Sequence, residues 1–234
     1  MSNLRSFPNA IKYALVITVD NYQGLRDQGY PGFDDIEETK ADRQQHLDGL
    51  PHLGFEPENI IDLNNPTREE VHAKVTELRN VILDNAANGK RSFLYSYFGG
   101  AGATIGAPGQ VIVLNGADKH VGYPLESRLE VLSSCNGMVC VAMVFDCSRV
   151  PLSPGLGRGE NDEAEAAEWA AIEGGFNNRS RNLLVYRSAP AGMQAPPASP
   201  VAAAFFEHLK NACKKNGKSS TMDLINFTRY TEVS

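Results

Sequence analysis

Residues 92–103 read SFLYSYFGGAGA and residues 138–149 read MVCVAMVFDCSR, and these two stretches decide the fold. Each begins with aromatic, β-branched and other apolar residues without polar alternation, which is typical of a strand buried on both faces. The first run ends in the small residues of 99–103 and the second in the polar residues of 146–149. Because function gathers at the carboxyl ends of parallel strands, these two turns form the candidate site.

The rest of the chain alternates between strands and helices. Apolar runs predict further strands over residues 13–19, 59–63 and 183–186, and a short hairpin strand over residues 110–114. Helices are predicted over residues 34–50, 67–89, 124–132, 164–172, 200–214 and 222–230. The clearest helix begins at Thr67, which predicts a capping box with Glu70. This alternation predicts an α/β fold with a mainly parallel central sheet, covered by helices on both faces.

Composition and charge narrow the class of protein. The 234 residues are 42% hydrophobic and 21% charged, which is ordinary for one globular domain. The net charge of -6, without a long basic block, argues against a nucleic-acid-binding surface. The cysteines form no CxxC pair or disulfide framework, and they join no histidine in a zinc cluster. The N-terminal stretch has no signal-peptide pattern and no membrane span, so we expect a cytoplasmic protein without membrane association.

The two strand-end motifs resemble those of the caspase-like cysteine peptidases, particularly the metacaspases and paracaspases. Residues 97–103, YFGGAGA, are similar to the family's Tyr-Tyr-Ser-Gly-His-Gly-Ala segment. Residues 145–149, FDCSR, are similar to its Leu-Asp-Cys-Cys-Arg or Asp-Ser-Cys-His segment. Further similarities lie at residues 31–35, at residues 53–55 and at the start of the predicted helix near residue 200.

The resemblance covers most of the chain, from about residue 12 to about residue 230. It implies a three-layer α/β/α sandwich with a mainly parallel central sheet, formed by a single caspase-like domain over residues 1–234. A large-subunit-like part would span about residues 10–150, a linker about 151–163 and a small-subunit-like part about 164–234.

The resemblance implies a cysteine endopeptidase in which both catalytic positions are substituted. Ala101 stands at the position of the family's histidine, and Ser148 stands at the position of its cysteine. Alanine cannot accept a proton and an unassisted serine hydroxyl is a poor nucleophile, so we predict little or no peptidase activity. Cys147 is an alternative nucleophile, although a shift of one residue re-aims a strand side chain. Gly102 is a candidate backbone N–H donor for the oxyanion, or simply part of a tight turn.

The same resemblance assigns three residues to substrate binding. Asp146 matches the acidic residue of the family's specificity site, Asp35 matches its partner from the first loop, and Gly99 lies beside them. Paired carboxylates would favour Arg or Lys before the scissile bond of a peptide or protein substrate. For Asp35 the residues alone leave a second interpretation open, that of a carboxylate at a helix N-terminus.

Several alternatives remain open. The paired substitution fits either natural drift to a pseudoprotease or deliberate inactivation, and the chain could act as a scaffold that binds peptides or partners without chemistry, including as a homodimer. No cofactor is predicted, although calcium stays a candidate through Glu160, Asp162 and Glu163, which lack the ordered spacing of a calcium loop. The glycines after residue 99 do not match the GxGxxG spacing of a dinucleotide site.

Overall fold

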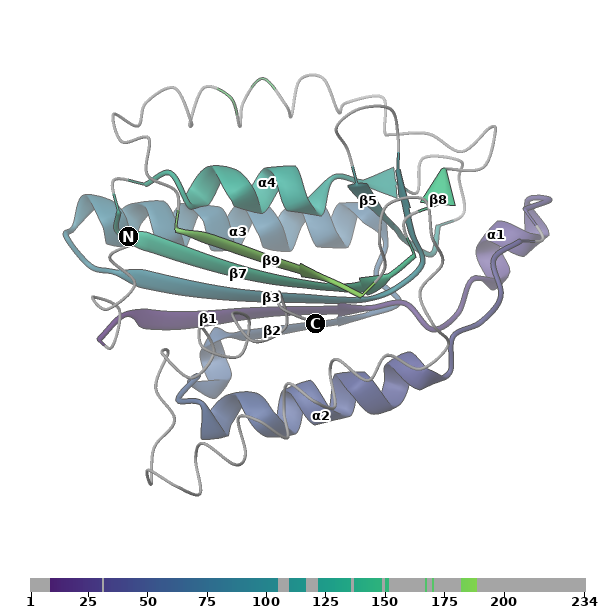
Figure 1. Ribbon diagram of the computed structural model, residues 1–234, viewed down its shortest axis with the longest axis horizontal. Helices are drawn as coiled ribbons and strands as arrows, with labels where there is room; N and C mark the ends of the chain where they lie inside the picture. The colour runs from purple at the N-terminus through teal and green to yellow at the C-terminus, as the bar shows by residue number, and fades with distance from the viewer. Residues whose placement is uncertain are drawn as a thin grey trace.

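Figure 1 shows the computed structural model of the chain as a ribbon. The structure describes residues 9–30, 32–104, 110–116, 122–135, 137–148, 150–151, 167, 170 and 182–188. Ala167 and Ala170, the described residues of the predicted helix near 164–172, are helical. The predicted helices at 200–214 and 222–230, and the predicted linker from residue 152 onward, lie outside the described residues.

The central sheet is built from the strands that the apolar runs predict (Figure 1). It has five strands in the order β2-β1-β3-β7-β9, and each neighbouring pair is parallel. These strands are β1 Ile11–Thr18, β2 Ile60–Asn64, β3 Ser92–Gly100, β7 Val139–Cys147 and β9 Leu183–Arg187. All residues of β3 are buried, as the unbroken apolar run predicts. The prediction of a mixed α/β fold with a mainly parallel sheet is therefore confirmed.

A smaller sheet lies beyond the carboxyl end of β3, in the order β6-β5-β4-β8. Its strands are β4 Gly102–Thr104, β5 Gln110–Val113, β6 Gly122–Tyr123 and β8 Val150–Pro151. Strand β5 confirms the predicted hairpin strand, because it pairs antiparallel with both β4 and β6. Pro151, at the approximate start of the predicted linker, belongs to β8 and is the register partner of Thr104. The small residues after β3 also pair as a strand, which the sequence did not predict.

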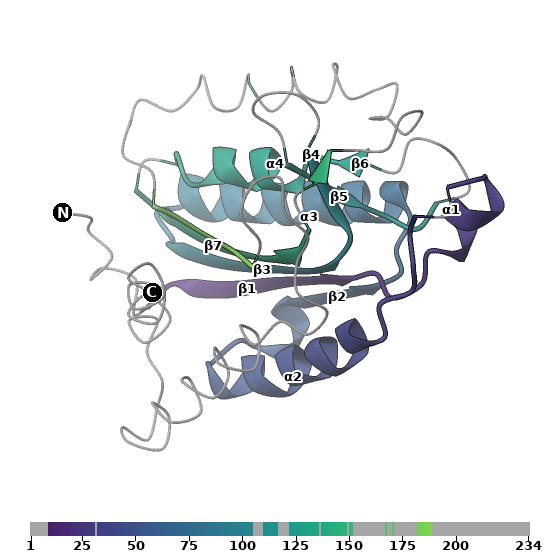
Figure 2. The same cartoon turned by 45° about the vertical axis from the view of Figure 1, so that its right-hand side comes forward.

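Helices lie on both faces of the central sheet, as Figures 1 and 2 show. Helices α3 (Arg68–Ala87) and α4 (Leu125–Leu132) lie on one face, and α2 (Glu38–His52) lies on the other. The structure also contains the short helix α1 (Gln23–Asp27) and the 3-10 turn η2 (Pro57–Asn59). The predicted capping box is confirmed, because the Thr67 side chain accepts from the Glu70 N–H and the Glu70 carboxylate accepts from the Thr67 N–H.

Strand alternation divides the core into two clusters, one on each face of the sheet. On β7, Val141, Met143, Phe145 and Cys147 belong to the cluster that includes residues of α3 and α4. Cys140, Ala142 and Val144 belong to the cluster that includes Leu50 of α2. By the same alternation, Asp146 and Cys147 point to opposite faces, and this separation shapes the site.

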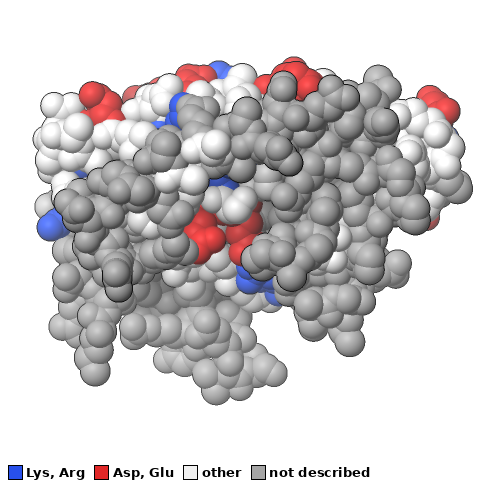
Figure 3. Space-filling model, turned by 90° about the horizontal axis from the view of Figure 1, so that it is seen from above, with Lys and Arg blue, Asp and Glu red and all other residues white. Residues whose placement is uncertain are grey.

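The surface in Figure 3 is the face that carries α3 and α4, seen from above. Acidic and basic side chains lie among one another on its coloured part, rather than in separate patches. Within the part of the chain that the structure describes, none of the helices combines the length and the apolar character that crossing a bilayer requires.

Candidate functional site

The two turns singled out in the sequence lie side by side at the carboxyl edge of the sheet. In the β3–β7 ladder Gly99 is the register partner of Asp146, and Gly100 is the partner of Cys147. A Cβ atom on Gly102 would lie 2.4 Å from the Ser148 carbonyl oxygen and 2.5 Å from the Cys147 Sγ. The chain segments that carry Ala101 and Ser148 are therefore in direct contact.

Tyr22, which sequence reasoning missed, holds the backbone of Ala101. The Ala101 N–H donates to the Tyr22 hydroxyl at 2.6 Å, and that hydroxyl donates to the Val113 carbonyl oxygen at 3.2 Å. The Val113 N–H in turn donates to the Ala101 carbonyl oxygen at 2.9 Å. Burial raises the pKa of the Tyr22 phenol well above its ordinary value, so the group stays a neutral donor and acceptor. Both backbone polar groups of Ala101 are thus engaged inside the fold.

Replacing Tyr22 with Phe should destabilise the protein by about 2 kcal/mol. The ring would still fill its place, but the buried N–H of Ala101 and the carbonyl oxygen of Val113 would lose the hydroxyl that bridges them. Urea unfolding of Tyr22→Phe beside the parent chain measures the difference. A change below about 0.5 kcal/mol would show that the hydroxyl is not needed to hold the turn.

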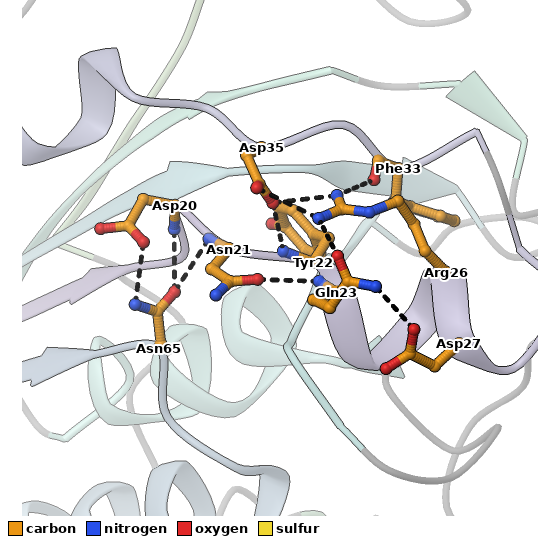
Figure 4. Close-up of polar contacts among 9 residues, drawn as sticks. All are labelled: Asp20, Asn21, Tyr22, Gln23, Arg26, Asp27, Phe33, Asp35 and Asn65. Carbon is orange, nitrogen blue, oxygen red and sulfur yellow. Dashed lines mark hydrogen bonds and ion pairs between the residues drawn. The ribbon is translucent and has the colours of Figure 1, made fainter.

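Asn65 fixes the start of the loop that carries Tyr22, as Figure 4 shows. Its side-chain oxygen accepts from the N–H groups of Asp20 and Asn21 at 3.0 and 3.1 Å, and its amide nitrogen donates to the Asp20 carboxylate at 2.9 Å. Asn65 has a φ of 50°, a left-handed conformation that asparagine adopts more readily than most residues. This clamp ties the ends of β1 and β2 together next to the candidate site.

Asp35 is bound within its own loop. Its carboxylate accepts from Arg26 Nη1 at 2.9 Å and Nη2 at 3.1 Å, and from the Tyr22 N–H at 2.9 Å (Figure 4). The hydrogen bond from Arg26, followed by the one from Tyr22, lowers the pKa of Asp35. Asp35 does not lie in the first turn of α2, which begins at Glu38, but its carboxylate accepts from the N–H of Tyr22, the N-cap residue of α1. The helix predicted to begin at residue 34 begins at Glu38, because the Asp35 side chain binds Arg26 and Tyr22 in the preceding segment.

Asp146 has a different carboxylate neighbour, Asp42 of α2, which sequence reasoning also missed. Burial, followed by repulsion from Asp146 and Glu38, raises the pKa of Asp42 to about 6. The charge of Asp146 also contributes to raising the pKa of Tyr97 and of Tyr186, after burial. Both Asp42 and Asp146 are partly exposed. The charge of Asp146, at the end of β7, therefore acts on Asp42 of α2, which covers the same face of the sheet.

A helical spacing could have revealed Asp42. The residues of α2 that are buried against the sheet are Thr39, His46 and Leu50. Asp42 lies three residues after the first of these and four before the second, so all four share one face of the helix. An acidic residue on the buried face of a helix that covers the end of a strand is a signal for a functional carboxylate.

The Asp42→Asn substitution should stabilise the protein at neutral pH by about 1 kcal/mol, after allowance for solvent screening. The pKa of Asp42 is raised to about 6 in the fold, so the charged form is disfavoured there and costs stability above that pH. The gain should shrink as the pH falls through about 6 and vanish near pH 4, where the native carboxyl is protonated. Urea unfolding at several pH values measures it. Equal stability of variant and parent at about pH 7.5 would contradict this prediction.

Cys147 and Ser148 lie in different surroundings. Cys147 is 1% exposed and belongs to the cluster on the α3 and α4 face, whereas Ser148 is only partly buried. A peptide carbonyl could not reach the Cys147 sulfur without rearrangement of this core. The structure therefore does not favour Cys147 as a shifted nucleophile.

His46 belongs to the opposite face. Its Nδ1 lies 2.7 Å from the Asp42 carbonyl oxygen, and its Nε2 lies 2.9 Å from the Tyr95 hydroxyl. Because the carbonyl can only accept, Nδ1 carries the proton and Nε2 accepts from Tyr95. Burial lowers the pKa of His46 to about 3, which keeps the ring neutral. The ring packs on Tyr97, on the α2 side of the sheet, and therefore cannot serve as the base for a group on the Cys147 side.

Gly99 and Gly102 each leave space for a neighbouring group, in addition to the substrate-binding and oxyanion roles that were predicted for them. A Cβ on Gly99 would lie 2.8 Å from the Tyr97 hydroxyl, so glycine leaves room for that ring to extend toward the sheet edge. Gly102 leaves room for the end of β7. Its part as an oxyanion donor stays a prediction, as does substrate contact by Gly99.

Among the described residues, no three His, Cys, Asp or Glu side chains gather where they could hold a metal ion. The calcium candidates Glu160, Asp162 and Glu163 lie outside those residues.

In the comparisons with known proteins, no family model and no curated protein matches the chain.

Proposed function

We propose that this chain is a caspase-like domain of the metacaspase or paracaspase kind, which has lost its catalytic groups and binds peptides that contain Arg or Lys. One observation carries the proposal: the segment with Ala101 touches the segment with Ser148, at the shared edge of β3 and β7. These are the positions at which the family that the sequence resembles has its histidine and its cysteine. A three-layer α/β/α arrangement around the parallel sheet belongs to the same proposal.

The side chains present at these positions explain why the chain should bind without cleaving. A cysteine peptidase needs a thiolate and a histidine that takes and returns a proton. Ala101 has no titratable group, and Ser148 offers a hydroxyl in place of a thiol. A carboxylate pair at the same edge of the sheet would still attract a basic side chain. In its present form the domain would therefore act as a binding module, which includes the role of a peptide-binding scaffold.

The proposal is tested by restoring both groups. The double variant Ala101→His/Ser148→Cys should cleave peptides after Arg or Lys, and the present chain should not. A folded double variant that cleaves none of the Arg, Lys or Asp peptides offered would argue against the proposed lineage.

A further inference from the structure

We propose that Asp35 is a positioning residue, which acts through Tyr22 on the backbone of Ala101 and does not itself touch a substrate. The inference rests on the proposed function and deepens it, because it gives this carboxylate a different role at the same site. It replaces the role that the sequence motif suggests, in which Asp35 binds a basic side chain.

The Tyr22 hydroxyl lies where the central sheet joins the smaller sheet. Ala101 is the residue between β3, which ends at Gly100, and β4, which begins at Gly102. A Cβ atom on Gly100 would lie 2.8 Å from the Tyr22 oxygen, so the hydroxyl packs directly against the end of β3. The same oxygen binds the Ala101 N–H and the carbonyl oxygen of Val113 in β5. One hydroxyl therefore contacts both sheets at the residue that joins them.

Asp35 holds the other end of Tyr22. Its Oδ1 accepts from the Tyr22 N–H at 2.9 Å, and the Tyr22 ring packs on Phe33 with 5.7 Å between the ring centroids. The ring is fully buried, so it has little freedom to turn independently of its backbone. A shift of the Tyr22 backbone would therefore move the hydroxyl that holds Ala101.

Arg26 fixes the Asp35 carboxylate in turn, as Figure 4 shows. Its Nη1 and Nη2 donate to the two carboxylate oxygens at 2.9 and 3.1 Å, a bidentate geometry that sets the orientation of both groups. The same guanidinium donates to the Phe33 carbonyl oxygen at 2.8 Å and to the Gln23 side-chain oxygen at 2.9 Å. A substrate cation would have to compete with Arg26 for this carboxylate.

The contacts run from the surface to the buried end of a strand. The Arg26 and Asp35 side chains are 23% and 41% exposed, whereas Tyr22 is buried. A surface ion pair contributes little to the stability of a whole domain, and local opening needs less free energy than global unfolding. Breaking this ion pair should therefore loosen the turn at Ala101 and leave the rest of the sheet closed.

Amide hydrogen exchange, followed by NMR on the isotope-labelled full chain, tests the inference without a substrate. Asp35→Ala removes the acceptor of the Tyr22 N–H, so the Ala101 amide should exchange roughly tenfold faster or more. The amide of Leu94, a buried residue of β3, should exchange at the parent rate. Asp27→Ala is the matched control, because Asp27 is an exposed carboxylate on α1 that accepts from Gln23 instead of Tyr22.

Arg26→Met separates positioning from substrate contact, because the two roles predict opposite effects. If Asp35 positions Tyr22, loss of the guanidinium should speed exchange at Ala101 by roughly tenfold, as in Asp35→Ala. If Asp35 binds a basic side chain, the same loss would free its carboxylate and tighten binding of a fluorescein-labelled arginine peptide, measured by fluorescence anisotropy. We expect no tightening. Should Asp35→Ala not fold, Arg26→Met decides by itself.

Asp35→Asn is the conservative variant. Its amide oxygen can still accept from the Tyr22 N–H, so exchange at Ala101 should stay within about threefold of the parent rate. The same change removes the negative charge, which would weaken binding of the arginine peptide by roughly tenfold if Asp35 touched that peptide.

The outcomes separate this inference from the proposed function. Faster exchange at Ala101 in Asp35→Ala and Arg26→Met, with Leu94 and the Asp27→Ala control at the parent rate, supports the inference. Unchanged exchange at Ala101 overturns it, as does an equal increase at Leu94, which would show a loss of global stability. Tighter peptide binding by Arg26→Met, or clearly weaker binding by Asp35→Asn, also overturns it. The exchange results do not depend on cleavage, so the double variant of residues 101 and 148 judges the proposed function separately.

Discussion

The Ala101→His/Ser148→Cys variant is expected to cleave an arginine peptide roughly a thousandfold or more faster than the present chain, whose rate should be indistinguishable from background. The reason is that the two positions lie on touching segments, so a histidine and a thiol introduced there would lie at the same edge of the sheet. General base assistance and a thiolate nucleophile each lower the barrier, and they act as one unit.

Single variants provide the control for this experiment. Ala101→His alone lacks the thiol and Ser148→Cys alone lacks the base, so each should stay within about tenfold of background. Activity of the double variant should fall at low pH as the new histidine becomes protonated. Cleavage by Ser148→Cys alone, at a rate close to that of the double variant, would show that another group serves as the base.

The Gly102→Ala substitution should have the largest effect on stability, a loss of about 3 kcal/mol. The added methyl carbon would lie 2.4 Å from the Ser148 carbonyl oxygen and 2.5 Å from the buried Cys147 sulfur. Neither neighbour is the free end of a flexible side chain, so the end of β7 would have to move away from β4. That movement would disturb the β3–β7 ladder, whose last paired residues are Gly100 and Cys147.

Gly32→Ala is the matched control for this prediction. A Cβ atom at Gly32 would have no heavy atom within 4 Å outside its immediate chain neighbours, so the change should stay within about 0.5 kcal/mol. Urea or thermal unfolding of the two variants measures the contrast. Equal stability of Gly102→Ala and Gly32→Ala would show that β7 and β4 are further apart than the structure places them.

The carboxylate neighbours of Asp146 could not be predicted from the sequence motif alone. The motif singles out Asp35 because it follows the first strand, but in the structure Asp35 binds Arg26, and Asp42 is the carboxylate whose pKa the charge of Asp146 raises. The choice depends on where α2 begins and on how it is rotated over the sheet, and neither is a local property. Tyr22 was missed for a similar reason, because its partners Ala101 and Val113 are remote in the chain.

The sequence by itself indicated the parallel sheet, because short unbroken apolar runs that alternate with helices are typical of strands covered on both faces, and it showed that positions 101 and 148 carry neither an imidazole nor a thiol. The tertiary structure alone decided which side chains meet at the sheet edge. It brought Asp42 within reach of the charge of Asp146, turned Cys147 into the core cluster on the α3 and α4 face, and brought Gly102 into contact with the end of β7. The physical reason is that strand runs and residue chemistry are local, whereas the rotation of a helix and the approach of two strand ends are set by packing across the whole domain.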